Sequence, residues 1–386
     1  MHLRGAKSST EMEKSMGMEN IPVIDSHIHI RGYHDLKNTL AVAQNISEKC
    51  SLAGVNVLAL SAWDADSAGQ NVLCMACKAL YPETYAYANF DYFYEGVDKT
   101  AMGRLEQLKA FMAMGFDGVK LIETKPSSRK FVGIGLDDES YELCFDYMEK
   151  EQIPIIWHVA DPEENWDAEL CGEYAKEHGW YYGDGTFLSK EELYQETFRV
   201  LDRHPGLKVT FAHMLFLTKD IRRAAEVMEK YPNVRLDITP GCELYFNFDA
   251  DYEGWRNFLL RYQDRIVFGT DNGWGDEPSP AEKVESGSKI IRMLKEYFST
   301  ENIVEAWDGK EIKGMNLPKE ALERIFAGNF MELQKGKKSK PINLAQAASY
   351  GKNVLERTKG ESAIGNDARK QLEELVEMLS AMEGNG

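Results

Sequence analysis

Residues 22–30 read PVIDSHIHI, an apolar run that ends in two histidines, His27 and His29. In a β-strand, residues two positions apart point to the same face, so these two imidazoles are aimed together while Ile28 and Ile30 point away. Two neutral imidazoles at the end of a buried strand make half of a metal site. A chance pair of surface histidines is the alternative. The apolar flanks disfavour it, because histidines in a buried strand need partners.

Apolar, β-rich runs recur along the chain at near-regular intervals, with helical patterns between them. The predicted strands are 23–30, 55–61, 85–90, 118–122, 153–158, 209–213, 234–238 and 266–271. The helical patterns include 98–114, 141–151, 190–203, 218–231 and 252–263. Alternating strands and helices indicate parallel βα units, and the closed form of eight such units is the (β/α)8 TIM barrel, an α/β fold. An open doubly wound sheet is the rival, but no glycine-rich phosphate loop follows the first strand.

The pattern divides the chain into three parts. Residues 1–20 are polar, lack the apolar core of a secretory signal, and are expected to form a disordered N-terminal extension. Residues 21–335 hold the barrel, and residues 336–386 form a helical tail that begins with the basic sequence GKKSKP. One helical face of the tail carries Leu372, Leu375, Val376 and Leu379. We expect this face to dock onto the barrel or to contact another subunit.

The interval between the fifth and sixth predicted strands is too long for a simple βα connection. Its extra part, residues 161–187, is rich in acidic and aromatic residues and follows the C-terminal end of a strand. In a barrel that end is the active-site face, so the segment is predicted to cover the site. The aromatic side chains expected to exclude water are Trp166, Trp180, Tyr181 and Tyr182. A surface subdomain or a subunit contact is the alternative.

Charge and cysteine usage exclude several classes of function. The chain has 45 basic and 63 acidic residues and no basic stripe, so nucleic acid and anionic membranes are poor partners. No run approaches the roughly 18 apolar residues of a membrane span. Six scattered cysteines indicate free thiols in a cytoplasmic protein, and the lone pair Cys74 and Cys77 is expected to be buried rather than metal-binding. A small-molecule substrate is the expected partner, and a homo-oligomer is possible.

Further chemistry-bearing residues end other predicted strands. His158 ends the fifth strand, His213 the sixth and Asp271 the eighth. In a parallel barrel all C-terminal strand ends open onto one mouth, so these side chains are predicted to meet His27 and His29 there. Three roles stay open for His213: a metal ligand, a proton shuttle or a core histidine. Asp271 is predicted to be a buried, paired carboxylate rather than a helix cap.

These strand-end motifs resemble those of the amidohydrolase superfamily. The matching elements are DSHIH (25–29), His158, His213 and GTD (269–271), with supporting echoes in GFDGVKL (115–121), HVADP (158–162) and GNFMEL (328–333). The spacing is most similar to the amidohydrolase-related (amidohydrolase 2) branch, which contains metal-dependent hydrolases and non-oxidative decarboxylases. The resemblance covers about residues 20 to 335.

The resemblance implies one divalent metal, most often zinc with manganese as the alternative. Its implied ligands are His27, His29, His158 and Asp271. Asp271 would also move protons, and a protonated His213 would polarise the attacked carbonyl. A two-metal site through Lys120 or Glu123 stays open, and Lys120 could instead pair with Asp237.

The expected reaction is hydrolysis of a C–N or C–O bond, as in an amide or lactone, by a metal-activated water. Non-oxidative decarboxylation is the alternative reaction. A third class is a catalytically inactive barrel that acts as a binding protein. The substrate-binding candidates are Arg31, Lys120, Trp63 and Trp274. Arginine is suited to bidentate recognition of a carboxylate, so Arg31 predicts a small anionic substrate. Lys125, Arg129 and Lys130 add basic residues after the fourth strand, although Arg31 could simply neutralise Asp64 or Asp66.

Overall fold

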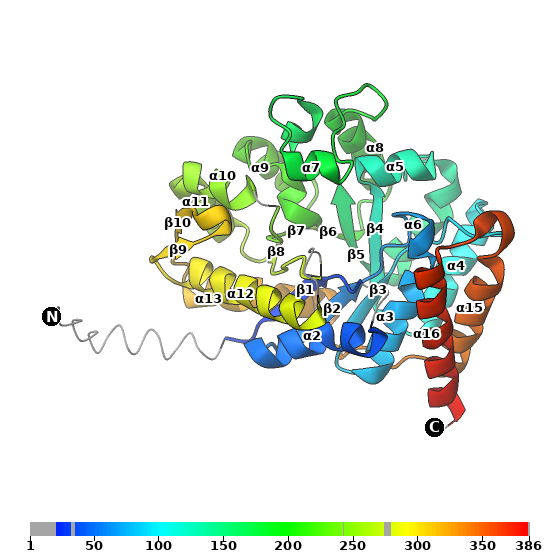
Figure 1. The fold of residues 1–386 in the computed structure, drawn as a ribbon. Coiled ribbons are helices and arrows are strands. Elements are labelled where there is room, and N and C mark those ends of the chain that lie inside the picture. Colours follow the sequence, from blue (N-terminus) through cyan, green and yellow to red (C-terminus); the bar gives the residue numbers. More distant parts are fainter. Residues whose placement is uncertain (1–20, 32–34, 242, 274–278, 385–386) are drawn as a thin grey trace.

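The computed structural model describes residues 21–31, 35–241, 243–273 and 279–384 (Figure 1). Eight parallel strands pair in sequence order. They are β1 (Ile24–Ile28), β2 (Gly54–Leu58), β3 (Tyr85–Ala88), β4 (Gly118–Thr124), β5 (Pro154–Val159), β6 (Lys208–Phe211), β7 (Val234–Asp237) and β8 (Ile266–Val267). A bridge between Ile28 and Asn272 and a 3.1 Å hydrogen bond from Ser26 N to Phe268 O join the first strand to the last. The sheet is therefore nearly closed, and the predicted TIM barrel is confirmed.

Helices lie between the strands and surround them (Figure 1). The main ones are α2 (Leu36–Cys50), α3 (Gln70–Leu80), α4 (Ala101–Met114), α5 (Pro126–Val132), α6 (Glu142–Glu151), α7 (Glu173–Glu177), α8 (Lys190–Arg203), α9 (Ile221–Lys230), α10 (Glu243–Ala250), α11 (Tyr252–Arg261) and α12 (Pro280–Ser299). Local chemistry sets their ends. Helix α4 begins after Thr100, whose side chain accepts from Gly103 N, and stops at Gly115, whose φ of +109° suits glycine. After α12 come a hairpin, β9 (Ile303–Glu305) and β10 (Glu311–Lys313), and then α13 (Lys319–Glu323) and α14 (Asn329–Leu333).

Several strands end earlier than the sequence pattern predicts, and in β6 and β8 this changes the place of a site residue. Strand β6 ends at Phe211 and β8 at Val267, so His213 and Asp271 lie in the connections that follow. Both residues have positive φ, 54° and 57°, which takes the backbone out of the extended conformation. The apolar pattern indicated the strands correctly, but their ends depend on contacts made by these two polar residues.

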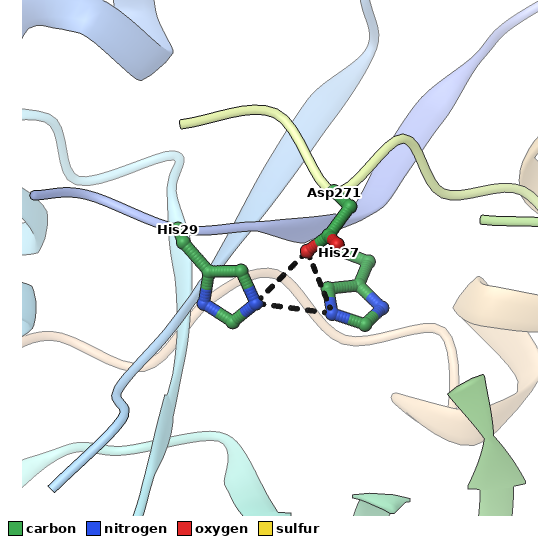
Figure 2. A group of neighbouring side chains, drawn as sticks. All are labelled: His27, His29 and Asp271. Atoms are coloured by element: carbon green, nitrogen blue, oxygen red, sulfur yellow. Dashed lines mark hydrogen bonds and ion pairs between the residues drawn. The ribbon is translucent and has the colours of Figure 1, made fainter. Parts of the chain in front are cut away.

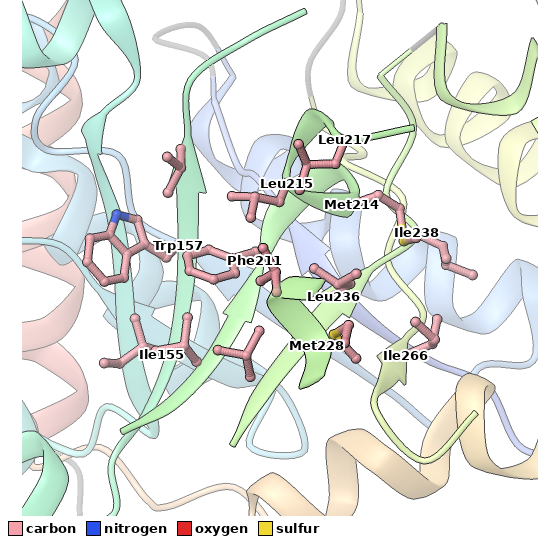
Figure 3. Close-up of a cluster of buried hydrophobic side chains, with 14 of the residues drawn as sticks. Ile155, Trp157, Phe211, Met214, Leu215, Leu217, Met228, Leu236, Ile238 and Ile266 are labelled. Atoms are coloured by element: carbon pink, nitrogen blue, oxygen red, sulfur yellow. The ribbon is translucent and has the colours of Figure 1, made fainter. Parts of the chain in front are cut away.

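The apolar core between strands and helices holds the strand ends in place. Figure 3 shows Ile155 and Trp157 of β5 beside Phe211 of β6 and Leu236 of β7, and all four side chains are buried. Met228 of α9 belongs to the same cluster. Each such burial contributes about 1.5–3 kcal/mol, so the strand ends that carry polar residues are mounted on a rigid base.

The tail forms two helices, α15 (Leu344–Arg357) and α16 (Asn366–Gly384), which pack on each other and on α3 (Figure 1). Leu372, Leu375, Val376 and Leu379 are buried in the cluster shared with α3. The apolar face of the tail therefore docks onto the barrel of its own chain. The expected disordered extension, residues 1–20, lies outside the described residues.

Asp117, at the N-terminal end of β4, ties this tail to the barrel. Its carboxylate pairs with the buried Lys78 ammonium and accepts hydrogen bonds from Ala86 N at 3.0 Å and Lys340 N at 2.9 Å.

Each of the five described cysteines, among them Cys74 and Cys77 of α3, is a buried free thiol.

We expect Asp117→Ala to lower the free energy of unfolding by about 3–5 kcal/mol, because it leaves Lys78 as an uncompensated buried charge. Urea denaturation of the full chain measures the change. The matched control is Glu83→Ala, which removes the pair with Lys338, a pair whose side chains are 80% and 85% exposed. Exposed pairs contribute about 0–1 kcal/mol, so equal losses in the two variants would contradict the role of Asp117.

Candidate metal centre

Three polar side chains converge at the C-terminal mouth of the barrel (Figure 2). His27 belongs to β1, His29 follows it directly, and Asp271 lies four residues beyond β8, where its N–H donates to His27 O at 2.8 Å. Asp271 Oδ1 is 3.1 Å from His29 Nε2 and 3.5 Å from His27 Nε2. The two Nε2 atoms are 3.2 Å apart. Among the described residues, these three form the group whose ligand atoms could hold a metal ion.

The hydrogen bonds behind the two imidazoles decide what their inner nitrogens can do. His27 Nδ1 donates to Asp237 Oδ2 at 2.9 Å, and His29 Nδ1 donates to Leu58 O at 3.0 Å. Burial lowers the pKa of both histidines, which keeps the rings neutral. Each Nε2 therefore carries a lone pair. Both Nε2 atoms lie near Asp271 Oδ1, an oxygen that has no hydrogen-bond donor among the described residues, and His27 Nε2 also accepts from Lys120 Nζ at 3.0 Å. Three converging acceptors fit a divalent cation, and the outer hydrogen bonds fix the tautomer that a metal ligand needs.

Asp237 is the residue that sequence reasoning undervalued. It ends β7, and besides holding His27 its Oδ1 accepts from His213 N at 2.7 Å and from Thr239 N at 3.1 Å. The sequence pattern suggested Asp237 only as a partner for Lys120. Its place at a predicted strand end, like that of the other site residues, was the signal that could have identified it.

His213 lies on a strained turn. Its φ of 54° is followed by positive φ values at Met214, Leu215 and Phe216, so four consecutive non-glycine residues are left-handed. Such conformations cost about 1–3 kcal/mol each and persist where the surroundings enforce them. Here the hydrogen bond from His213 N to Asp237 and that from Tyr194 OH to Leu215 O, at 2.7 Å, hold the turn.

The strained turn aims His213 Nε2 at Asp271 Oδ2, 3.9 Å away, while Nδ1 donates to Thr239 O at 3.2 Å. Burial lowers the pKa of His213 to about 4, so the ring is neutral at pH 7. This differs from the protonated imidazole expected from the sequence, because burial outweighs the attraction of the neighbouring carboxylates. His213 therefore offers an acceptor nitrogen to the mouth.

His158 of β5 lies beside this group, with its ring centroid 5.0 Å from that of His213. Its Nε2 hydrogen-bonds to Asp161 Oδ1 at 3.0 Å, so in this structure that nitrogen faces a carboxylate. Asp161 also pairs with Lys125 and accepts from Tyr182 OH at 2.5 Å. The role of His158 as a further metal ligand stays a prediction, and Asp161 is a second residue that sequence reasoning missed.

Lys120 and Glu123, the two candidates for a second metal site, have different surroundings in the structure. Lys120 of β4 points into the mouth, and its Nζ lies 3.0 Å from His27 Nε2. Burial lowers its pKa to about 8. Glu123 instead accepts from Asn89 Nδ2 at 2.8 Å and Tyr92 OH at 2.7 Å, so it is engaged away from the three-residue group. Lys120 thus contacts His27 by hydrogen bond, rather than the Asp237 partner considered from the sequence.

A hollow of about 300 Å³ adjoins the metal-ligand group. Its lining includes His29, Asp271, Lys120, Lys125, Trp63 and Trp180. The segment 161–187 contributes Asp161, Pro162, Asn165, Tyr174, Ala175 and Trp180. The insertion therefore forms part of the wall, as expected. Of its four predicted aromatic residues, Trp180 is the one in the lining, while Trp166 packs on Tyr182, with centroids 5.0 Å apart.

The other substrate-binding candidates lie around this hollow. Arg31 places its guanidinium carbon 5.7 Å from the ring centroid of Trp63, and it is not among the lining residues described. Arg129 pairs with Glu196 at 3.0 Å. Trp274 lies outside the described residues. Lys120 and Lys125 are therefore the cations that the structure brings into the hollow.

A parallel barrel with two histidines and an aspartate at its mouth is the arrangement typical of metal-dependent TIM-barrel enzymes. A family model described as Amidohydrolase matches residues 24–331, and the chain belongs to this family. The predicted family is therefore confirmed, and the protein is an enzyme of the metal-dependent hydrolase superfamily. No curated protein matches the sequence.

Solved structures of similar proteins include three enzymes. The 4-oxalomesaconate hydratase of Rhodopseudomonas palustris is 16% identical, with a TM-score of 0.48, covering 86% of this chain and 99% of that one. The 5-carboxyvanillate decarboxylase of Sphingomonas paucimobilis is 11% identical, with a TM-score of 0.46 and coverage of 82% and 99%. The apo IDCase of Metarhizium anisopliae is 15% identical, with a TM-score of 0.49 and coverage of 83% and 98%. Identities this low say nothing about the substrate of this chain.

None of the described helices is long and apolar enough to cross a membrane.

Proposed function

We propose that this enzyme hydrolyses a C–N or C–O bond, in an amide or lactone, of a small carboxylate-bearing substrate. The observation that carries the proposal is the convergence of two imidazole lone pairs and one carboxylate oxygen beside a hollow at the mouth of the barrel. His27, His29 and Asp271 would hold one divalent metal, with His158 as a further ligand. Two imidazoles and a carboxylate suit zinc, with manganese as the alternative. The buried free thiols support a cytoplasmic location.

A divalent metal, when bound, supplies a Lewis acid and lowers the pKa of water toward roughly 7. Asp271 accepts the proton of the attacking water and returns it to the leaving group. His213 is neutral, and its Nε2 accepts a hydrogen bond that keeps this water beside Asp271 Oδ2. Lys120, with a pKa of about 8, stays mostly protonated at pH 7 and stabilises negative charge that develops on the substrate.

Lys120 and Lys125 support the choice of an anionic substrate. Both ammonium groups are buried and line the hollow, where their charge is less screened than in water. Lys125 is already balanced by Asp161, so Lys120 is the better partner for a carboxylate. The indoles of Trp63 and Trp180 supply apolar sides.

Protein purified without chelator is expected to carry about one divalent metal per chain, measured by inductively coupled plasma mass spectrometry. His27→Ala should lose the metal, because it removes one of the converging lone pairs. His158→Ala tests the further ligand, since retention of the metal would limit the site to His27, His29 and Asp271. Less than about a tenth of an equivalent, even after zinc or manganese is supplied, would contradict the proposal and favour a barrel that only binds.

Product analysis tests the reaction itself. A panel of small amides and lactones, each with a free carboxylate, is incubated with the metal-loaded enzyme and followed by mass spectrometry. Addition of one water to the products supports hydrolysis. Release of carbon dioxide without cleavage of an amide or lactone would identify the decarboxylase alternative.

A further inference from the structure

A second hollow, of about 650 Å³, adjoins the one beside the metal-ligand group. Its lining includes Trp63, Trp180, Phe131, Phe187 and Lys130. Trp63 and Trp180 also line the inner hollow, so the two spaces are neighbours across this pair of indoles. We call the hollow beside the metal-ligand group the inner hollow and the second one the outer hollow. The proposed reaction does not use the outer hollow.

The two indoles come from different parts of the chain. Trp63 follows β2, and Trp180 belongs to the insertion after β5. Their rings meet edge to face, with centroids 6.4 Å apart and planes at 89°. On the inner side, Lys125 Nζ lies 4.7 Å from the Trp180 ring and 5.8 Å from the Trp63 ring. Cation–π attraction of this kind holds both rings close to the ammonium.

The outer wall is made of phenylalanines. Phe131, on α5, is 62% exposed although it is a large apolar side chain. Phe187 closes another side, and Lys130 Nζ rests 4.0 Å from its ring centroid while donating to Thr186 Oγ1 at 2.7 Å. An exposed aromatic beside a hollow with further aromatic walls indicates a binding surface rather than incidental exposure.

We propose that the outer hollow is a second substrate subsite that binds an uncharged aromatic ring. The inference rests on the proposed function, because it places the carboxylate end of the same substrate in the inner hollow near Lys120. Aromatic rings pair edge to face or offset at centroid distances of about 4.5–7 Å, and Trp63, Trp180, Phe131 and Phe187 offer both edges and faces. Lys130 and Asp64, one cation and one anion, both line the hollow, so its lining does not select an end group of one charge.

The test measures equilibrium binding, so it does not depend on turnover. Biphenyl-4-carboxylate, benzoate and 4-cyclohexylbenzoate are titrated into the metal-loaded full chain by isothermal calorimetry. We expect the biphenyl compound to bind about tenfold more tightly than benzoate, because its distal ring reaches the outer hollow. Equal affinity of the cyclohexyl compound would overturn the aromatic preference, and equal affinity of benzoate would overturn the subsite.

Two variants test whether the outer hollow is responsible for the tighter binding of biphenyl-4-carboxylate. Phe131→Ala should bring the affinity for biphenyl-4-carboxylate to within about threefold of benzoate, leaving benzoate binding unchanged. The control is Leu80→Ala, which removes a partly exposed apolar side chain at the end of α3, outside both hollows, and should change neither affinity. An unchanged preference in Phe131→Ala would contradict the proposal. If the ring preference holds while no amide or lactone is cleaved, the subsite stands and the proposed reaction fails. Cleavage without the preference would support the reaction and overturn the subsite.

Discussion

Asp271→Asn is expected to lower turnover by about a hundredfold or more while part of the metal stays bound. The amide keeps the shape of the side chain and one oxygen ligand, but it cannot accept a proton from the attacking water. Asp271 Oδ1 faces both imidazoles and Oδ2 faces His213, so in the proposed mechanism one carboxylate would serve ligation and proton transfer through different oxygens. Initial rates on a cleaved substrate and the metal content of the same preparation check both parts of the expectation.

A rival carboxylate provides the matched control. Glu243 of α10 lines the inner hollow, and burial raises its pKa to about 7, a value suited to a general base. Glu243→Gln is expected to lower turnover by less than about tenfold, because nothing places Glu243 among the metal-ligand atoms. If Glu243→Gln is as damaging as Asp271→Asn, or if Asp271→Asn keeps near wild-type activity, the base is wrongly assigned.

Asp237→Asn is expected to weaken metal affinity by about 10–100-fold. The carboxylate accepts the Nδ1 proton of His27 and so leaves the Nε2 lone pair available to the proposed metal. An amide nitrogen at that position would donate instead, which favours the other tautomer and places a proton on Nε2. The amide oxygen can still accept from His213 N, so the strained turn is kept. Competition with a chromogenic chelator measures the affinity.

Asp117→Asn is the control for this second experiment, since it also replaces a buried aspartate but at the N-terminal end of β4. It should reduce stability without changing the metal affinity of the folded protein. Wild-type metal affinity in Asp237→Asn would show that the tautomer of His27 is set by something other than Asp237, for example by Thr239 Oγ1, which lies 3.3 Å from the same nitrogen.

Local sequence pattern was enough to predict the barrel and the meeting of His27, His29 and Asp271 at its mouth. Apolar runs at regular spacing define strands because a parallel sheet is buried on both faces, and HIH on the first strand aims two imidazoles together because side chains alternate. The position of Asp271 after the last strand followed from the rule that strand ends share one mouth. These inferences need only periodicity and the parallel topology.

The hydrogen bonds and charge states at the mouth depend instead on contacts that form when the chain folds. The tautomer of His27 depends on Asp237, 210 positions away, and that of His29 on a carbonyl of β2. The left-handed turn at His213 contradicts local preference and exists because Asp237 and Tyr194 hold it. The neutral state of His213 follows from burial, which no local pattern reports. Likewise, the indole pair of Trp63 and Trp180 joins two connections far apart in sequence, because hydrogen-bond geometry, desolvation and ring contacts are properties of neighbours in space rather than along the chain.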